Sequence, residues 1–217
     1  MSGTQHITPI VPVGIEKEPV LLVDKSGSMN YAAAHGANIS RWGVITEALP
    51  TLVATLGAAD SQAEAEAAAG EDAGGLMTVV FSDRAEEVGD LNEANWREKW
   101  AKVTPGGGTY IMPGWQLVVE DYLEEFGNKA EEDRPALLLL VVTDGEATDM
   151  AAFEAECAKA HGHTYVAVAV VGYGADHDNT VAAYQKIAAS NNHVQVYNFG
   201  STTDPTAFAE GLLAIVE

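Results

Sequence analysis

The chain has 217 residues, 47% of them hydrophobic and 20% charged, a composition that supports one folded domain and excludes disorder throughout. Eleven Lys and Arg stand against 32 Asp and Glu, so the formal net charge is −21. A surface this acidic repels nucleic-acid phosphates and anionic membranes, and it favours cations and basic partners. We therefore expect neither a nucleic-acid partner nor a membrane partner.

Cysteine content and the first residues bear on the compartment. Cys157 is the only cysteine in the sequence, which excludes an internal disulfide and a cysteine-rich zinc or iron–sulfur site. Residues 1–14 lack the basic start and the continuous apolar run of a signal peptide. No apolar run approaches the roughly 20 residues of a membrane span. We expect a cytoplasmic protein.

The chain is predicted to begin with an extended arm over residues 1–18, in which prolines bracket isolated β-branched residues. A single domain is expected to follow over residues 19–217. Its first element is the run Pro19–Asp24, which is too short for a helix and is predicted as a strand buried on both faces. This strand ends on a carboxylate.

Amphipathic helices are predicted between further apolar runs, because apolar residues recur at steps of three and four. We expect a kink at Pro50 and helix N-caps at Asp178 and Asp204. The other predicted strands cover residues 76–81, 136–143, 165–172 and 194–199. The expected buried helix faces are Trp42, Ile45, Leu49, Leu52 and Leu56; Trp115, Val118, Tyr122 and Phe126; Met150, Phe153 and Cys157; Val181, Tyr184 and Ile187; and Phe208, Leu212 and Ile215.

Buried strands that alternate with amphipathic helices predict an α/β fold, with a doubly wound, mostly parallel central sheet and helices on both faces. After Phe81 only a short polar turn precedes residues 85–89, which leaves no room for a crossover helix. This segment is therefore predicted as an antiparallel edge strand. Residues 58–75 hold five acids and no base and are predicted as an acidic, low-complexity surface insertion.

Oxygen-bearing side chains follow the strands at the carboxyl edge, where open α/β sheets bind ligands. Asp24, Ser26 and Ser28 follow the first strand, Asp144 follows a later apolar run, and Thr109 ends a glycine-rich loop. Two carboxylates match the charge of a divalent cation, and hydroxyls add ligands without adding charge. This short oxygen set favours Mg²⁺ or Mn²⁺ over Ca²⁺, which takes more ligands. One coordination position is expected to stay open to an outside ligand.

The first of these loops reads Asp-Lys-Ser-Gly-Ser, which matches the pattern Asp-x-Ser-x-Ser, and a threonine and an aspartate follow at the expected later places. From about Pro19 to Val216 the chain resembles a von Willebrand factor type A (vWA) domain. The resemblance implies a Rossmann-like fold and a complete metal-ion-dependent adhesion site (MIDAS). The metal ligands that it implies are Asp24, Ser26, Ser28, Thr109 and Asp144.

In this family the open coordination position accepts an acidic side chain of a partner protein. The resemblance therefore implies a metal-dependent protein-binding module. We expect no catalytic residues and no enzymatic activity. It also implies that the last helix, over residues 204–215, can shift when the partner binds. Gly211 inside this helix lowers helix stability by about 1 kcal/mol relative to alanine, which fits a movable element.

Three alternatives differ in class from a binding module. A metal-assisted hydrolase or phosphatase needs a nucleophilic aspartate and commonly a second acid two residues on, where this chain has Ser26. A nucleotide-binding protein is disfavoured because the loop 106–109 lacks both the Gly-x-Gly-x-x-Gly and the Gly-Lys-Ser/Thr pattern. The third alternative is a scaffold whose metal site is not used for partner binding. A purely structural scaffold predicts no response to metal and no loss on changing Asp24.

The remaining conspicuous side chains are assigned to the core or to the rim of the site. Cys157 lies on an apolar helix stripe and is predicted as a core residue. Trp42 and Trp115 are expected to pack in the core as well. Tyr31 and Tyr110 flank the predicted site in sequence and are candidates for its rim.

Overall fold

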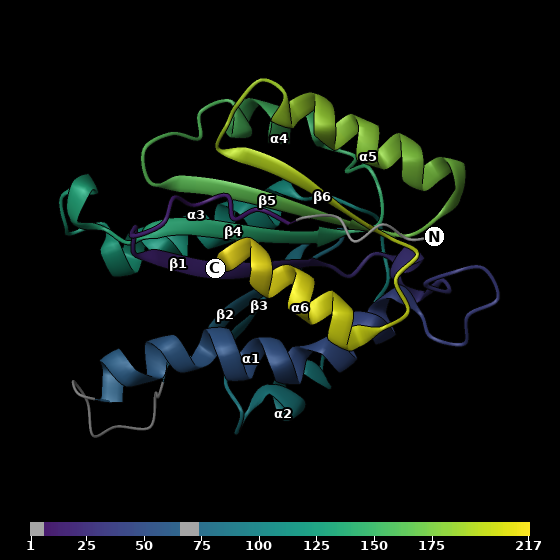
Figure 1. Cartoon of the computed structure of the whole chain (residues 1–217), viewed down its shortest axis with the longest axis horizontal. Helices are drawn as coiled ribbons and strands as arrows, with labels where there is room; N and C mark the ends of the chain where they lie inside the picture. Colours follow the sequence, from purple (N-terminus) through teal and green to yellow (C-terminus); the bar gives the residue numbers. More distant parts are fainter. Residues whose placement is uncertain (1–6, 66–73) are drawn as a thin grey trace.

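The structure, a computed structural model, describes residues 7–65 and 74–217. The described residues form one six-stranded sheet with the order β3-β2-β1-β4-β5-β6 (Figure 1). Its β3 strand pairs antiparallel with β2, and every other neighbouring pair is parallel. The predicted doubly wound sheet with one antiparallel edge strand is confirmed. The strands are β1 Lys17–Asp24, β2 Leu76–Phe81, β3 Ala85–Leu91, β4 Ala136–Thr143, β5 Thr164–Val171 and β6 Val194–Gly200.

Helices cover both faces of the sheet, as the sequence predicts. One face packs against α1, α2 and α6, and the other packs against α3, α4 and α5 (Figure 1). The short 3-10 helices η1 and η2 lie in loops. The bounds are η1 Gly27–Asn30, α1 Arg41–Ala65, α2 Trp96–Trp100, α3 Met112–Phe126, η2 Glu131–Asp133, α4 Met150–Cys157, α5 Gly174–Ala188 and α6 Pro205–Val216.

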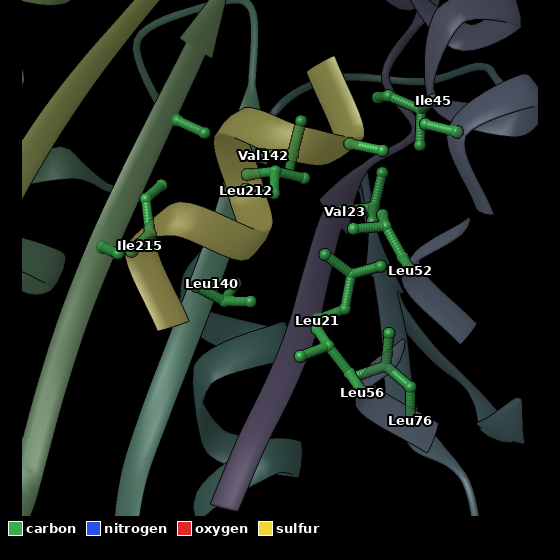
Figure 2. Close-up of a cluster of buried hydrophobic side chains, with 14 of the residues drawn as sticks. Leu21, Val23, Ile45, Leu52, Leu56, Leu76, Leu140, Val142, Leu212 and Ile215 are labelled. Carbon is green, nitrogen blue, oxygen red and sulfur yellow. The ribbon is translucent and has the colours of Figure 1, made fainter. Parts of the chain in front are cut away.

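The two-residue period of the strands divides the core into two layers. Leu21 and Val23 of β1 point to the α1 and α6 side, while Val20 and Leu22 point to the α3 side. Figure 2 shows the first layer, where side chains of α1 and α6 meet those of β1, β2 and β4. Every residue of β2 and β4 is buried, which explains why these strands appear in the sequence as continuous apolar runs.

The α6 helix closes the first core layer. Leu212 and Ile215 are buried, and Figure 2 shows Leu212 beside Val142 of β4. The helix begins after Asp204, whose carboxylate accepts backbone N–H bonds from the first turn, so the predicted cap is confirmed. Gly211 lies against the ring of Phe199 on β6, and a Cβ at this position would come 2.4 Å from Phe199 Cε1. This glycine permits close packing, which is a different role from loosening the helix.

Three local features differ from the sequence prediction. Helix α5 begins at Gly174 after Tyr173, so Asp178 lies inside the helix and the predicted cap there is wrong. The α2 helix was not predicted, because it has five residues and no apolar period. Trp42 was expected in the core but is half-buried at its margin, where Trp100 of α2 stacks on it with ring centroids 4.5 Å apart.

Two predicted segments are described in part. In the arm predicted over residues 1–18, Ile10 and Val11 are buried against the core, and Tyr197 of β6 donates a hydrogen bond to the Thr8 carbonyl at 2.8 Å. Strand β1 already begins at Lys17. In the segment 58–75, α1 continues to Ala65, and residues 66–73 lie outside the described part of the chain, as do residues 1–6.

Candidate metal centre

The candidate site lies at the carboxyl ends of β1 and β4, which are neighbours in the sheet. From β1 the chain builds the sheet outward through β2 and β3, and then returns to β4 on the other side and continues outward through β5 and β6. The crevice where the strand order reverses is the usual ligand site of an open α/β sheet. Asp24 ends β1, and Asp144 directly follows β4.

Asp24 is completely buried, and hydrogen bonds hold both of its carboxylate oxygens. Oδ1 accepts the backbone N–H of Ser26 at 2.7 Å, and Oδ2 accepts the hydroxyl of Thr143 at 2.7 Å. Burial and the nearby Asp144 carboxylate raise the pKa of Asp24 from 3.8 to about 6, although these hydrogen bonds act in the opposite direction. The site therefore contains a buried carboxylate whose charged form a bound cation would stabilise.

A chain of hydrogen bonds joins three more of the predicted ligands. The hydroxyl oxygens of Ser26 and Ser28 are 3.1 Å apart, and the Ser28 hydroxyl donates to Asp144 Oδ1 at 2.7 Å. The structure thus brings Asp24, Ser26, Ser28 and Asp144 together, although 116 positions separate Ser28 from Asp144. All four present oxygen atoms, which are the donors that hard divalent cations prefer.

The glycine-rich loop that carries Thr109 is fastened to the loop after β1. The Gly27 N–H donates to the Gly107 carbonyl at 3.0 Å, and the Gly106 N–H donates to the Lys25 carbonyl at 2.6 Å. Gly107 has a φ of +87°, and a Cβ there would come 2.5 Å from Asp83 Oδ2, so this position requires glycine. Thr109 is half-buried in the loop next to the four connected residues.

The same loop is also fastened to the segment after β4. The Thr148 N–H donates to the Thr109 carbonyl at 2.7 Å. The carboxylate of Asp149 accepts the N–H groups of Ile111 and Met112, each at 3.0 Å, and so caps the start of α3 from another loop. The three loops therefore form one connected unit. Sequence reasoning missed Asp149, since its role depends on a contact between distant segments.

Arg41, the first residue of α1, is a functional candidate that sequence reasoning also missed. Its Nη1 forms an ion pair with Asp144 Oδ2, and its side chain is only 12% exposed. The rings of Tyr31 and Tyr173 lie 5.9 and 5.8 Å from its guanidinium carbon. One signal in the sequence was available, because Arg41 is the only Lys or Arg between Lys25 and Arg84.

An open cavity of about 340 Å³ lies beside the connected residues. Its walls include Ser28, Asp144, Arg41 and the two tyrosines that flank the guanidinium. Tyr31 is 65% exposed, as its predicted place at the rim requires. Tyr110, the second predicted rim residue, is 39% exposed and follows the Thr109 loop. Of the five predicted ligands, Ser28 and Asp144 line this cavity.

The donor set fits a small hard cation. The four connected residues combine two carboxylates with two hydroxyls. The described residues contain no cluster of three or more His, Cys, Asp or Glu placed to hold a metal. A softer metal that needs histidine or thiolate ligands is not matched by these oxygen donors. Cys157 is buried on α4, and burial raises the pKa of its thiol to about 12, so the core assignment is confirmed.

Structural neighbours share this architecture at low sequence identity. A mutant of the PilB minor pilin from Streptococcus sanguinis aligns over 95% of this chain and 62% of its own, with a TM-score of 0.62 and 12% identity. The SpRpn10 VWA domain aligns over 90% of this chain and 94% of its own, with a TM-score of 0.58 and 9% identity.

A third neighbour is proximal thread matrix protein 1 from the mussel byssus, solved with a zinc-occupied MIDAS motif. It aligns over 93% of this chain and 47% of its own, with a TM-score of 0.54 and 16% identity. The chain thus spans less than two thirds of the pilin and of the byssus protein. Likeness at such identities establishes the fold alone.

Sequence comparison identifies the family. No curated protein matches the chain as a relative. In the described residues, no helix has the length and apolar character needed to cross a membrane. The model of the von Willebrand factor type A domain matches residues 20–210, which is most of the chain. The chain therefore belongs to the von Willebrand factor type A domain family.

Proposed function

We propose that the chain is a divalent-metal-dependent protein-binding module, in which a bound Mg²⁺ or Mn²⁺ accepts a carboxylate from a partner protein. The residues proposed to hold the ion are Asp24, Ser26, Ser28, Thr109 and Asp144. A divalent ion at this position would supply a Lewis-acidic coordination site for the partner's carboxylate. The vWA family supports this assignment, since its domains commonly mediate protein–protein interactions.

One observation carries the proposal. Asp24 is fully buried beside a second carboxylate, and hydrogen bonds fix both of its oxygens. Burying a carboxylate is costly unless a partner charge offsets it. The hydroxyls of Ser26 and Ser28 lie between the two carboxylates, so a cation bound there would meet oxygen donors from more than one loop.

The oxygen donors favour Mg²⁺ or Mn²⁺ over Ca²⁺, because two carboxylates and a few hydroxyls supply fewer ligands than Ca²⁺ takes. The byssus protein with its zinc-occupied MIDAS motif supports the capacity of this fold to hold a divalent ion. The acidic charge of the chain does not oppose a carboxylate ligand. The ion acts locally, and salt screens distant charges beyond about 10 Å.

The alternative of a phosphatase with Asp24 as nucleophile is less well supported. Such a mechanism commonly needs a second acid two residues after the nucleophile, and that position holds Ser26. Lys25, the adjacent cation, pairs with Glu86 of β3 at 2.6 Å and so does not serve as a clamp for phosphate. We propose that the site binds and does not catalyse.

The test is a thermal melt of metal-stripped protein with and without Mg²⁺, Mn²⁺ or Ca²⁺. A ligand that binds only the folded chain stabilises it by about 2.7 kcal/mol at 100 times its Kd, and the midpoint rises accordingly. Asp24→Asn keeps the shape of the side chain and removes its charge. The matched control is Asp121→Asn, which removes a carboxylate from α3, away from the site.

We expect Mg²⁺ and Mn²⁺ to raise the midpoint of the wild type and of Asp121→Asn, and to leave Asp24→Asn unchanged. An equal shift in all three proteins would place the ion elsewhere and overturn the site. If the wild type shows no midpoint shift and no heat of binding in a calorimetric titration with Mn²⁺, the chain is a scaffold that does not use a metal.

A further inference from the structure

Arg41 places a permanent positive charge inside the candidate metal site. Its guanidinium pairs with Asp144 Oδ2, while the other oxygen of Asp144 accepts the Ser28 hydroxyl. The Asp144 side chain has no exposed surface, and that of Arg41 is 12% exposed. Arginine stays protonated at every ordinary pH, so this charge is a constant part of the site. Water and salt weaken the attraction within an exposed ion pair, and they weaken it much less in a buried pair such as this one.

The surroundings of Arg41 fix the guanidinium in place. Tyr31 and Tyr173 flank it, and the backbone of Gly172 lies beneath it, where a Cβ would come 3.4 Å from the guanidinium carbon. Gly172 has a φ of +129°, so glycine is required there on conformational grounds as well. The Arg41 N–H donates to the Tyr31 carbonyl at 3.0 Å and holds the start of α1. The charge is therefore preorganised.

The nearby charges determine what this arginine does to the site. Lys25 is paired with Glu86, and the cavity carboxylates of Glu146 and Asp176 are exposed to solvent, where water and salt screen them. Lys25 is buried as well, but Glu86 cancels its charge. The remaining charges of the site are those of Asp24, Asp144 and Arg41, which together carry one negative charge. A divalent cation turns this into one positive charge, and one further carboxylate brings the site to neutrality.

We propose that Arg41 is an internal counter-ion that weakens the binding of a lone divalent cation and couples cation binding to the partner's carboxylate. The inference rests on the proposed function and deepens it. Without Arg41, two carboxylates neutralise the ion by themselves, and the demand for an anionic partner falls. With Arg41, metal and carboxylate each raise the affinity of the other by the same factor, as linkage requires. Arg41 acts through Asp144 and is thus a positioning residue.

The test is a calorimetric titration of the full metal-stripped chain with Mn²⁺, in chloride and in acetate at equal ionic strength. Acetate is the probe for a partner carboxylate. The variants are Arg41→Met, which removes the charge, and Arg41→Lys, which keeps it. Lys102→Met is the matched control, because it changes the net charge equally at an exposed pair with Glu98.

We expect Arg41→Met to bind Mn²⁺ in chloride at least about tenfold more tightly than the wild type, because a nearby like charge is removed. Acetate is expected to tighten Mn²⁺ binding in the wild type and to do so less in Arg41→Met. Arg41→Lys and Lys102→Met should stay within about threefold of the wild type. Metal-free Arg41→Met should melt at a lower temperature, since Asp144 loses its buried partner.

A purely structural role for Arg41 predicts lower stability with unchanged or weaker Mn²⁺ binding, and that result would overturn the inference. If the wild type binds Mn²⁺ more tightly in acetate and Arg41→Met behaves identically, the inference fails and the proposed function stands. Absence of Mn²⁺ binding in every protein overturns both. Should Arg41→Met not fold, Arg41→Gln removes the charge, keeps a donor for Asp144, and carries the same expected direction.

Discussion

Two regions of the molecule gather carboxylates, and they hold them in opposite ways. At the candidate metal centre two carboxylates are buried, joined through serine hydroxyls and neutralised in part by Arg41. The second region, the acidic cleft, is a cavity of about 140 Å³ between β3 and α3. Its carboxylates are those of Glu18, Glu87, Asp90, Asp121 and Glu125.

The acidic cleft has more carboxylates and a weaker case for a ligand. Three of them, on Glu87, Asp90 and Glu125, are exposed, and the other two are half-buried. Water solvates such groups well, so they do not require a cation. At the metal centre, burial removes that water and hydroxyl groups fix the oxygen positions. The comparison teaches that burial and preorganisation of a few oxygens indicate a metal site better than the number of acids.

The largest expected effect concerns the hydrogen bond that Thr143 donates to Asp24. Thr143→Val keeps the shape and removes the donor at 2.7 Å, which leaves one oxygen of a buried carboxylate without its partner. We expect the free energy of unfolding of the metal-free protein to fall by about 2–3 kcal/mol, measured by urea denaturation. Thr78→Val is the control, since its buried hydroxyl donates to a neutral carbonyl and its loss should cost about 1 kcal/mol. Equal losses of unfolding free energy in the two variants would mean that the hydrogen bond to Asp24 contributes no more than that of an ordinary buried hydroxyl.

A smaller effect is expected for Ser28→Ala, which breaks the hydrogen-bonded link between Ser26 and Asp144. Arg41 still pairs with Asp144, so we expect a loss of about 1 kcal/mol in metal-free stability. Binding of Mn²⁺ should weaken at least about tenfold in calorimetry. Ser190→Ala, which removes a hydroxyl that donates to the Ile187 carbonyl, serves as the control and should leave Mn²⁺ binding unchanged. Unaltered Mn²⁺ affinity in Ser28→Ala would remove that serine from the proposed ligands.

The smallest effect is expected in the acidic cleft. Partial burial, with Glu87 and Glu124 nearby, raises the pKa of Asp121, so its charged form destabilises the fold and stability from this group increases as pH falls. Asp121→Asn should therefore stabilise the protein at neutral pH by less than about 0.5 kcal/mol, since solvent screens a partly exposed group. The gain, measured by urea denaturation, should shrink in high salt. Destabilisation by this variant would mean that the cleft carboxylates are held as specifically as those of the metal centre.

The sheet and the helices that cover it were predictable because each depends on a local pattern. Continuous apolar runs such as Ala136–Thr143 mark strands buried on both faces, and the stripe that contains Trp115 and Tyr122 marks a helix. The short turn after Phe81 was enough to predict an antiparallel edge strand. Helix α2 was not predicted because one turn of helix carries no apolar period. Trp100 attaches it to α1 by stacking on Trp42 and by donating a hydrogen bond to Thr46.

The candidate site was predictable only as far as residue types reveal it. Asp24 and Asp144 follow apolar runs, so their place at one edge of the sheet follows from topology, and the structure brings them together. Arg41 and Asp149 act through contacts with segments far along the chain, and no local spacing encodes such contacts. Whether Thr109 and the four connected residues ligate a metal stays a prediction.

The contact between Gly211 and Phe199 opposes sliding of α6 along its axis. The residues one turn away on the same side of the helix are Ala207 and Ala214. A slide of one turn would bring a methyl group to a place where a Cβ lies only 2.4 Å from the ring of Phe199. Phe199 is itself braced edge-on against Phe208, with ring centroids 4.9 Å apart. Any displacement of α6 along its axis must therefore move Phe199 together with Phe208 or separate the two rings.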